Sequence, residues 1–399
     1  MKKKLYALLG WSLLLASTLN PHFSTVYAQG SLAPPGPPGP TFKTLDQIEA
    51  RTPISLLPIT ISQPGSYYVT TNLTGITGTN GITIAADQVT LDLNGFALIG
   101  GIGHNGVLVS GTHNNLLICN GTVRDWKIDG VSATNALNSR FDRLLLTGNA
   151  SAGLRIGTGA RASSCSTRGN GVGISAGDVC AIVDCTAESN MSTGIVTLGS
   201  CTILNCTAND TISGQGIVAS THCLIKNCVA NSNNGTGISA EVGSVIEDCV
   251  ASSSTLGDGI NVGNSCNIIH CTARANKANG ITASSSCRIS GCMAADGNSE
   301  GIHVNVECLV EDNVCSANSP PIGVGIHATG VRNMITDNHI SSNGRGVLLD
   351  TAASAVIVKN VFSGNTTNLV FTGTAYLGPT NALSSLIVTN HPWANLPFP

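Results

Sequence analysis

Short runs of alternating apolar and polar residues recur along the chain, and between residues 180 and 315 they return every 21 to 24 residues. One such run reads Cys201-Thr-Ile-Leu-Asn-Cys206, and a polar stretch then leads to Gly216-Ile-Val. Alternation with a period of two is typical of β-strands, and no stretch is long or periodic enough to predict a helix. Each repeat is therefore expected to form one all-strand coil stacked on the coil before it.

A glycine followed by Ile, Val or Leu marks each repeat. In Gly-Ile-x-Val, strand alternation turns the Ile and the fourth residue inward and the third residue outward. Thirteen markers and one imperfect copy predict 14 coils, hence a solenoid roughly 65 Å long at the ~4.8 Å spacing of neighbouring strands. The markers are Gly81, Gly106, Gly130, Gly153, Gly171, Gly194, Gly216, Gly237, Gly259, Gly280, Gly301, Gly325 and Gly346, followed by Asn368-Leu-Val-Phe.

Three features of the repeat carry a family resemblance: the strand Gly-Ile-x-(Val/Ala), the strand and corner x-Ile-x-(Asn/Asp)-(Cys/Asn), and a polar return that ends in Asn. Over roughly residues 60 to 372 they resemble the right-handed parallel β-helix proteins of the pectin-lyase-like superfamily. Pro64-Gly-Ser-Tyr-Tyr and Pro392-Trp-Ala-Asn395 are also similar to exported bacterial members without an assigned activity. The resemblance implies an all-β fold, a single-stranded right-handed parallel β-helix. A leucine-rich repeat is disfavoured because the chain has no Leu spine and no helical segment.

The chain is expected to divide into five segments. Residues 1–28 are typical of a secretory signal peptide, with a basic start, an apolar run from Leu8 to Ala16 and a small-residue cleavage site at Ala28. The apolar run is shorter than the ~20 residues of a membrane span. We therefore expect an exported protein (secreted, periplasmic or at the cell surface) without a membrane span. Residues 29–45 form a Pro/Gly-rich linker, 46–80 an N-terminal cap, 81–372 the β-helix and 373–399 a C-terminal cap.

Composition and charge narrow the range of partners. The net charge is −3 and only 10% of the residues are charged, so no broad electrostatic field attracts nucleic acid or anionic membranes. Polysaccharide is the partner that the resemblance suggests. No cofactor is expected, and the oligomeric state stays open.

The fifteen cysteines fall into columns when the repeats are aligned. Stacked neighbours have Cβ atoms ~4.8 Å apart, whereas a disulfide requires about 3.8 Å, so buried thiol ladders are favoured over a set of disulfides. A metal site is disfavoured because the spacing is Cys-x4-Cys and the surroundings are apolar. The main column consists of Cys185, Cys206, Cys228, Cys249, Cys271 and Cys292, and it continues as Asn313, Asn338 and Asn360, where amide hydrogen bonds would pass from coil to coil.

One stretch of the outward column carries candidate chemistry. His303 and His327 are expected to be stacked neighbours about 5 Å apart, with Glu300 in the column before the glycine and Arg345 two coils on. Two imidazoles at this distance suit general acid and base catalysis, since one tends to stay neutral. The alternative is a solvated histidine pair on a polar face.

A second candidate site lies earlier in the chain, where seven of the 19 basic residues fall between residues 124 and 168. An aromatic ring flanked by Arg and Asp suits a sugar or uronate site, because the ring packs on the sugar and the guanidinium pairs with a carboxylate. The alternative is a mixed-charge solvated face. The candidate ligand-binding residues are Arg124, Trp126, Lys127, Asp129, Arg155 and Arg168.

Several absences speak against catalysis. The motifs of polygalacturonases and the carboxylate cluster of pectate lyases cannot be found, no aromatic residue occurs between Asp142 and Val361, and the repeats are short enough to predict no inserted loop that would wall a cleft. The leading hypothesis is therefore a non-catalytic exported scaffold that binds polysaccharide. The alternative is a polysaccharide lyase or glycoside hydrolase acting on an extracellular glycan.

Overall fold

The protein is described by a computed structural model that covers residues 49–350, 353–380 and 391–398. The predicted signal peptide and linker lie outside these residues. Every regular element among the described residues is a β-strand, and most strands show the burial alternation that the sequence predicts. In β29 (Ile260–Val262), for example, the two apolar side chains are buried and Asn261 between them is not.

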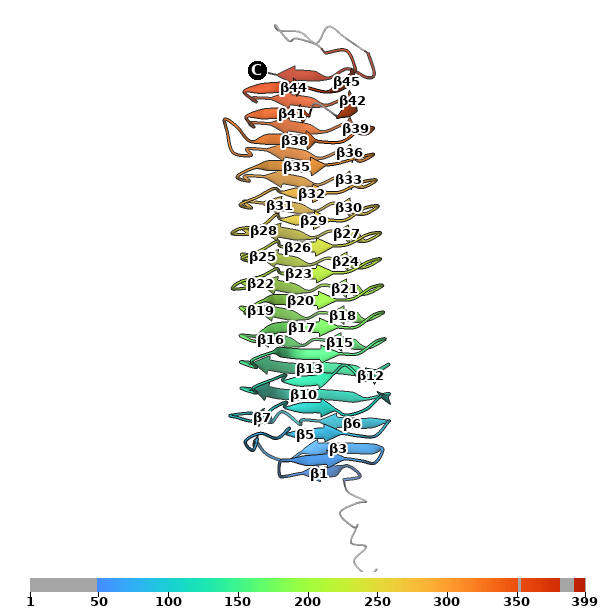
Figure 1. The fold of residues 1–399 in the computed structure, drawn as a ribbon, viewed down its shortest axis with the longest axis vertical. Coiled ribbons are helices and arrows are strands. Elements are labelled where there is room, and N and C mark those ends of the chain that lie inside the picture. The colour runs from blue at the N-terminus through green and yellow to red at the C-terminus, as the bar shows by residue number, and fades with distance from the viewer. Residues whose placement is uncertain (1–48, 351–352, 381–390, 399) are drawn as a thin grey trace, which may run out of the picture. The chain divides into compact units, whose positions relative to one another are not determined.

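One sheet of fifteen parallel strands forms what we call the first face of the coil stack (Figure 1). Each of its strands contains or directly follows the marker glycine, except at the two ends of the stack. The strands are β2 (Ile59–Ile61), β5 (Ile82–Ile84), β8 (Val107–Val109), β11 (Val131–Ala133), β14 (Ala152–Ile156), β17 (Val172–Ala176), β20 (Thr193–Thr197), β23 (Ile217–Ala219), β26 (Ile238–Ala240), β29, β32 (Ile281–Ala283), β35 (Glu300–Val304), β38 (Val324–Ala328), β41 (Arg345–Leu349) and β44 (Thr367–Phe371).

The second face begins at the N-terminal end with β1 (Thr52–Ile54) and β3 (Gly65–Val69), and β3 holds both Tyr67 and Tyr68. Its other strands are β6 (Val89–Asp92), β10 (Leu117–Arg124), β13 (Arg140–Thr147), β15 (Arg161–Ser163), β18 (Ala181–Val183), β21 (Thr202–Leu204), β24 (Leu224–Lys226), β27 (Val245–Glu247), β30 (Asn267–Ile269), β33 (Arg288–Ser290), β36 (Leu309–Glu311), β39 (Asn333–Thr336), β42 (Ser354–Val358) and β45 (Thr374–Leu377).

The third face shares β10 and β13, whose length lets them turn the corner and join both faces into one hydrogen-bonded sheet. Its other strands are β4 (Leu73–Thr74), β7 (Ala97–Ile99), β16 (Ser166–Arg168), β19 (Thr186–Glu188), β22 (Thr207–Asn209), β25 (Val229–Asn231), β28 (Val250–Ser252), β31 (Thr272–Arg274), β34 (Met293–Ala295), β37 (Val314–Ser316), β40 (His339–Ser341), β43 (Val361–Ser363) and β46 (Leu396–Phe398). A short pair, β9 (His113–Asn114) with β12 (Ala136–Leu137), lies outside both sheets.

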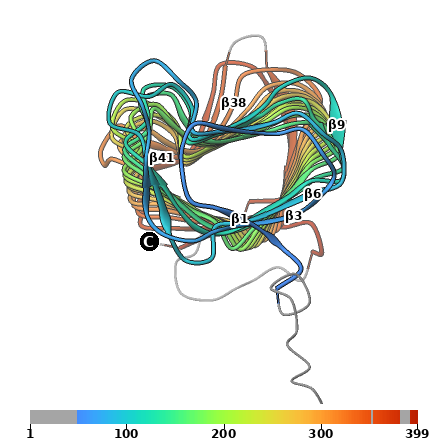
Figure 2. The ribbon, with the colours of Figure 1, turned by 90° about the horizontal axis from the view of Figure 1, so that it is seen from below.

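Seen along the stack, the coils superimpose around one closed outline (Figure 2). Inward columns of Ile, Val, Ala and Cys fill the interior and are almost fully buried. Every pairing within the sheets is parallel and joins equivalent positions of successive coils, as for Ile238 with Ile260 and Ile260 with Ile281. The predicted fold class, a parallel β-helix of about 14 coils, is confirmed.

The register corrects one marker. Leu154 pairs with Ile174 and Arg155 with Ser175, so the glycine equivalent to Gly153 is Gly173 and not Gly171. The coil is one of the shortest, and its Gly-Val-Gly sequence offered two choices. Ser175 is therefore the outward residue of this coil.

Both ends of the stack continue the coil pattern. The segment 46–80, which the sequence predicts to be a cap, contains β1 to β4, and β2 pairs with β5 in full coil register. At the other end, β45 and β46 extend the second and third faces.

The cysteines lie inside the coils, and all fifteen are buried and free. Three Sγ atoms in the main column take a hydrogen bond from the backbone N–H of the preceding coil: Cys228 from Cys206 at 3.5 Å, Cys249 from Cys228 at 3.4 Å and Cys292 from Cys271 at 3.4 Å. Asn313 takes over the same role, accepting from the N–H of Cys292 at 2.8 Å. The thiols therefore satisfy backbone groups that would otherwise be buried without a partner.

The asparagines that follow in this column form a ladder. The side-chain amide of Asn313 donates to Asn338 at 3.0 Å, that of Asn338 to Asn360 at 2.9 Å and that of Asn360 to Asn395 at 3.4 Å. Asn395 belongs to the C-terminal segment, so the ladder runs from the coils into that segment.

We expect the thiols to be unreactive in the folded protein. All fifteen thiols are buried, and an inaccessible thiol is a poor nucleophile; burial also raises the pKa of the Cys119 and Cys315 thiols. Titration of reduced protein with a chromogenic aromatic disulfide should modify fewer than about one thiol per chain before unfolding, and all fifteen in denaturant. Rapid reaction of several thiols in the folded protein would place the columns outside the coils.

Candidate functional site

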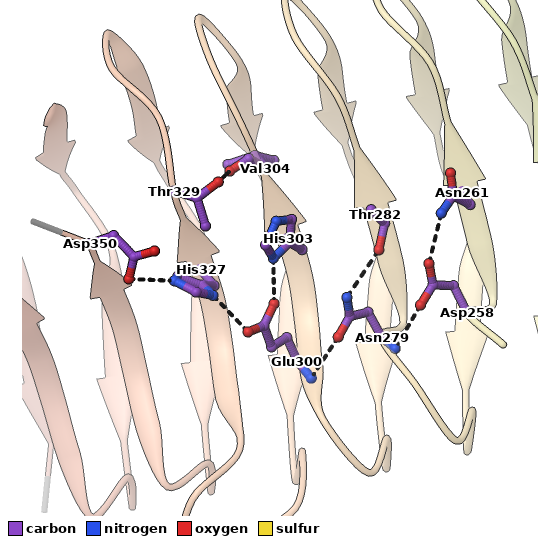
Figure 3. Close-up of polar contacts among 10 residues, drawn as sticks. All are labelled: Asp258, Asn261, Asn279, Thr282, Glu300, His303, Val304, His327, Thr329 and Asp350. Carbon is purple, nitrogen blue, oxygen red and sulfur yellow. Dashed lines mark hydrogen bonds and ion pairs between the residues drawn. The ribbon is translucent and has the colours of Figure 1, made fainter. Parts of the chain in front are cut away.

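A row of polar side chains crosses the outer surface of the first face over β29, β32, β35, β38 and β41 (Figure 3). Strand alternation explains the row, because the residue before each marker glycine and the second residue after it both point outward. These two positions form adjacent columns. They hold Asp258 and Asn261, Asn279 and Thr282, and Glu300 and His303 in three successive coils.

Hydrogen bonds join the row within and between coils. Asp258 accepts from the side chain of Asn261 and from the backbone N–H of Asn279, both at 2.9 Å. The Asn279 amide donates to Thr282 at 3.1 Å, and its oxygen accepts from the backbone N–H of Glu300 at 3.3 Å. The position of Glu300 is therefore fixed by the preceding coil.

Glu300 lies between two imidazoles. One carboxylate oxygen is 2.6 Å from Nδ1 of His303 and the other is 2.6 Å from Nδ1 of His327. The two histidines pair directly in register, and their ring centroids are 5.1 Å apart in an edge-to-face arrangement. The predicted stacking of His303 on His327 is confirmed. The sequence pattern places Glu300 nearby but does not show that it bridges the two rings.

Asp350 completes the cluster and was not singled out from the sequence. Its carboxylate lies 3.1 Å from Nε2 of His327, on the opposite side of the ring from Glu300. Strand alternation could have revealed it. Leu348 is the outward residue of its coil, and Asp350 lies two residues further on, so both side chains point outward. We refer to Glu300, His303, His327 and Asp350 as the Glu-His cluster.

The electrostatics of the cluster favour an ionised carboxylate. Burial disfavours the charged form of Glu300, but the hydrogen bonds from His303 and His327 outweigh it and lower the pKa to about 2. Burial also disfavours the charged form of His327, but its hydrogen bonds to Glu300 and Asp350 outweigh that and raise its pKa. The Glu300 and His327 side chains are only 18% and 12% exposed, which weakens screening by water.

Arg345 lies beside the cluster but does not join it. Its register partner is Val324, whose partner on the other side is Glu300. The side chain is exposed and makes no ion pair with any residue in the described part of the chain. Arg345 and Glu300 line a shallow pocket whose other lining residues are Asn298, Ser299, Ile322, Gly323, Val324 and Leu348.

A loop walls this pocket, contrary to the prediction that the repeats carry no insertions. Residues 317–323 connect β37 to β38 and protrude beyond the neighbouring coils (Figure 1). Ile322 at its tip is 72% exposed. The insertion was overlooked because the coil exceeds its neighbours by only a few residues.

The second candidate site does not form one surface. Trp126 is 1% exposed and points into the coil interior. Five glycines surround its ring so closely that a Cβ added at any of them would come within 2.9 Å of the ring. Its indole N–H donates to the backbone oxygen of Leu98. The proposed role of Trp126 as a sugar platform is therefore wrong, because its ring is not accessible. The five glycines are Gly75, Gly81, Gly100, Gly103 and Gly106.

The charged residues of that site lie on different faces. Asp129 is 3% exposed and pairs with Arg155 on the first face at 3.0 Å. Arg124 and Arg168 align on the third face with Thr147 between them, while Lys127 is exposed in a turn. Ligand binding by Arg124, Lys127 and Arg168 stays a prediction.

Residues 258–392 match the family model described as "Right handed beta helix region". The matched stretch contains the whole polar row, from Asp258 to Asp350. The described coils are therefore those of a right-handed parallel β-helix.

Several solved structures are similar to this chain over much of its length. The Azotobacter vinelandii mannuronan C-5 epimerase AlgE4 A-module has a TM-score of 0.48 and 15% identity, over 78% of this chain and 90% of its own. The periplasmic alginate epimerase AlgG has a TM-score of 0.45 and 14% identity, over 80% of this chain and 76% of its own. The Dettilon tailspike protein has a TM-score of 0.36 and 13% identity, over 82% of this chain and 60% of its own.

No curated protein matches the chain in sequence. Among the described residues there is also no helix long and apolar enough to cross a membrane.

Replacing Trp126 tests its interior position. Trp126→Ala should lower the free energy of unfolding by about 3–5 kcal/mol, as expected when a buried aromatic side chain leaves a cavity. Trp393 is 49% exposed, and Trp393→Ala should cost less than about 1 kcal/mol. Urea unfolding followed by circular dichroism would measure both. Equal, small losses would show that Trp126 is not part of the core.

Proposed function

We propose that the protein is exported and binds an extracellular polysaccharide along the polar row of the first face. The observation that supports this is the unbroken series of hydrogen-bonding side chains over five successive strands, from Asp258 to Asp350. Five strands at ~4.8 Å spacing give a straight row roughly 19 Å long.

The chemistry of the row suits sugars. Carboxylate and amide oxygens accept hydrogen bonds from hydroxyl groups, while amide N–H and imidazole N–H groups donate to them. A polysaccharide presents hydroxyl groups at regular intervals, and a row with one outward position per coil meets them at regular intervals too. Arg345, which is exposed beside Glu300, would pair with the carboxylate of a uronate.

The row has no Phe, Tyr or Trp side chain on which a sugar ring could stack, since none occurs between Asp142 and Val361. Binding would therefore rest on hydrogen bonds and charge, and affinity would depend on how many sugar units the row contacts.

A panel of immobilised polyuronates and neutral glycans tests this function. The double variant Asn279→Ala/Thr282→Ala should weaken binding about tenfold or more, because two hydrogen bonds worth about 0.5–1.5 kcal/mol each are lost. A matched control is Asn264→Ala/Thr272→Ala: Asn264 accepts a backbone N–H of the next coil as Asn279 does, and Thr272 lies on the third face. Loss of binding in the control alone, or no loss in the double variant, would refute the proposed row.

A second candidate function is proton transfer on a bound uronate, which is the polysaccharide lyase alternative. The contact that favours it is the hydrogen bond between Nδ1 of His303 and Glu300, which orients the ring and leaves Nε2 free to act as a base. In such a lyase, the base takes the proton beside the uronate carboxylate, the glycosidic C–O bond on the next carbon breaks, and the leaving oxygen gains a proton.

Incubation with the same polyuronates separates the two functions. A lyase would release unsaturated products and new reducing ends, and His303→Gln should lower the rate at least about a hundredfold, as expected for loss of a general base. His339→Gln changes an exposed histidine on the third face and should leave the rate unchanged. Binding without any product would leave the non-catalytic function standing and exclude the lyase.

A further inference from the structure

The Glu-His cluster brings together three groups of the kind that hold transition-metal ions. Glu300, His303 and His327 each offer one ligand atom, and these atoms lie within 4.8 Å of one another. Both imidazoles present Nδ1 to the same carboxylate at 2.6 Å. Two histidines and one carboxylate are a recurring ligand set for divalent transition metals.

Asp350 provides a second, independent observation. Nε2 of His327 lies 3.1 Å from Asp350, so if Nδ1 ligates an ion, the proton that remains on Nε2 has a carboxylate acceptor. A histidine that ligates a metal commonly donates its other N–H to a carboxylate in this way. Because Asp350 lies on the far side of the ring from Glu300, it would orient His327 without touching the ion (Figure 3).

The backbone holds the three groups in place. Glu300 and His303 come from β35 and His327 from β38, two neighbouring strands of one sheet in direct register. The N–H of Glu300 is also bonded to Asn279. Ligands on paired strands keep their separation, which is what a site for a specific ion requires.

We propose that Glu300, His303 and His327 bind one divalent transition cation of the Zn²⁺ type, with Asp350 as a positioning residue. Two imidazole ligands disfavour Ca²⁺ and Mg²⁺, which prefer oxygen. Three protein ligands leave further coordination positions open, and the His303 side chain is 27% exposed, so the open positions face solvent and the polar row. This inference goes beyond the proposed polysaccharide binding and does not depend on it.

Bound to a metal through Nδ1, His303 could not serve as the free base of the lyase candidate. The cation site and that base are therefore mutually exclusive.

Calorimetric titration of tag-free, metal-stripped full-length protein with Zn²⁺ tests the site. The wild type should bind one equivalent. Glu300→Gln and His327→Gln should each weaken binding at least about a hundredfold, since each removes a ligand, and Asp350→Asn about ten- to a hundredfold, as typical for the carboxylate partner of a ligating histidine. His339→Gln should bind as the wild type does.

Cobalt substitution gives a readout that does not depend on affinity. Co²⁺ at a site of two imidazoles and one carboxylate should give visible absorption without the near-ultraviolet thiolate band that cysteine ligands produce. The band would show that the buried thiols, rather than the cluster, hold the ion.

Three results would overturn the proposal: no Zn²⁺ binding by the wild type, an unchanged titration in Glu300→Gln and His327→Gln, or the thiolate band with Co²⁺. The Thr282→Ala variant keeps all three ligands and the contact between Asn279 and Glu300, so it should retain Zn²⁺ binding even where it loses polysaccharide. Failure of the metal site and failure of the proposed function are therefore distinguishable.

Discussion

The structure depends on parallel backbone pairing that places each residue on its counterpart in the next coil. The pairings of Ile195 with Ile217 and of Ile217 with Ile238 are typical of the whole stack. Equivalent side chains are consequently held about 4.8 Å apart. A column therefore accepts only residues that pack or hydrogen-bond with their own kind, and this is why so few residue types fill the interior.

The exchange of Cys for Asn in one column follows from the same constraint. At each corner a backbone N–H is turned inward and requires an acceptor. The sulfur of Cys249 and the amide oxygen of Asn313 both supply it, and both side chains also donate to a backbone carbonyl, Cys249 to Ile225 and Asn313 to Ile289. The difference is that Asn also passes a side-chain hydrogen bond to the next Asn. The column thus keeps one function while its residue type changes.

The sequence predicts the stack well because residues that pair between successive coils recur at the repeat period. Strand positions, inward columns, buried thiols and the pairing of His303 with His327 all follow from alignment of the repeats. It predicts poorly wherever the repeat is locally irregular. Trp126 was mistaken for a surface residue because only the coordinates show the five glycines that make room for it. Asp350 was overlooked because the register partner of His327 in the next coil is Leu348, and Asp350 contacts His327 from two residues further along.

On the first face, charged residues are kept apart within a column, and the histidine pair is the exception. In the column before the glycine, neutral Asn279 separates Asp258 from Glu300, and Val324 separates Glu300 from Arg345. No two charged residues are direct neighbours there. His303 and His327 are direct neighbours at 5.1 Å, and two protonated rings at that distance would repel by roughly 3 kcal/mol at an effective dielectric constant near 20.

A shared carboxylate relieves this repulsion, and a cation bound through the two Nδ1 atoms would remove the need for either ring to be protonated. Stability alone would be served as well by the Asn and Thr found one coil earlier. Local departures from an otherwise consistent design are where functional sites are expected, so the Glu-His cluster, rather than the basic region around Trp126, is the part of the molecule that stacking alone does not explain.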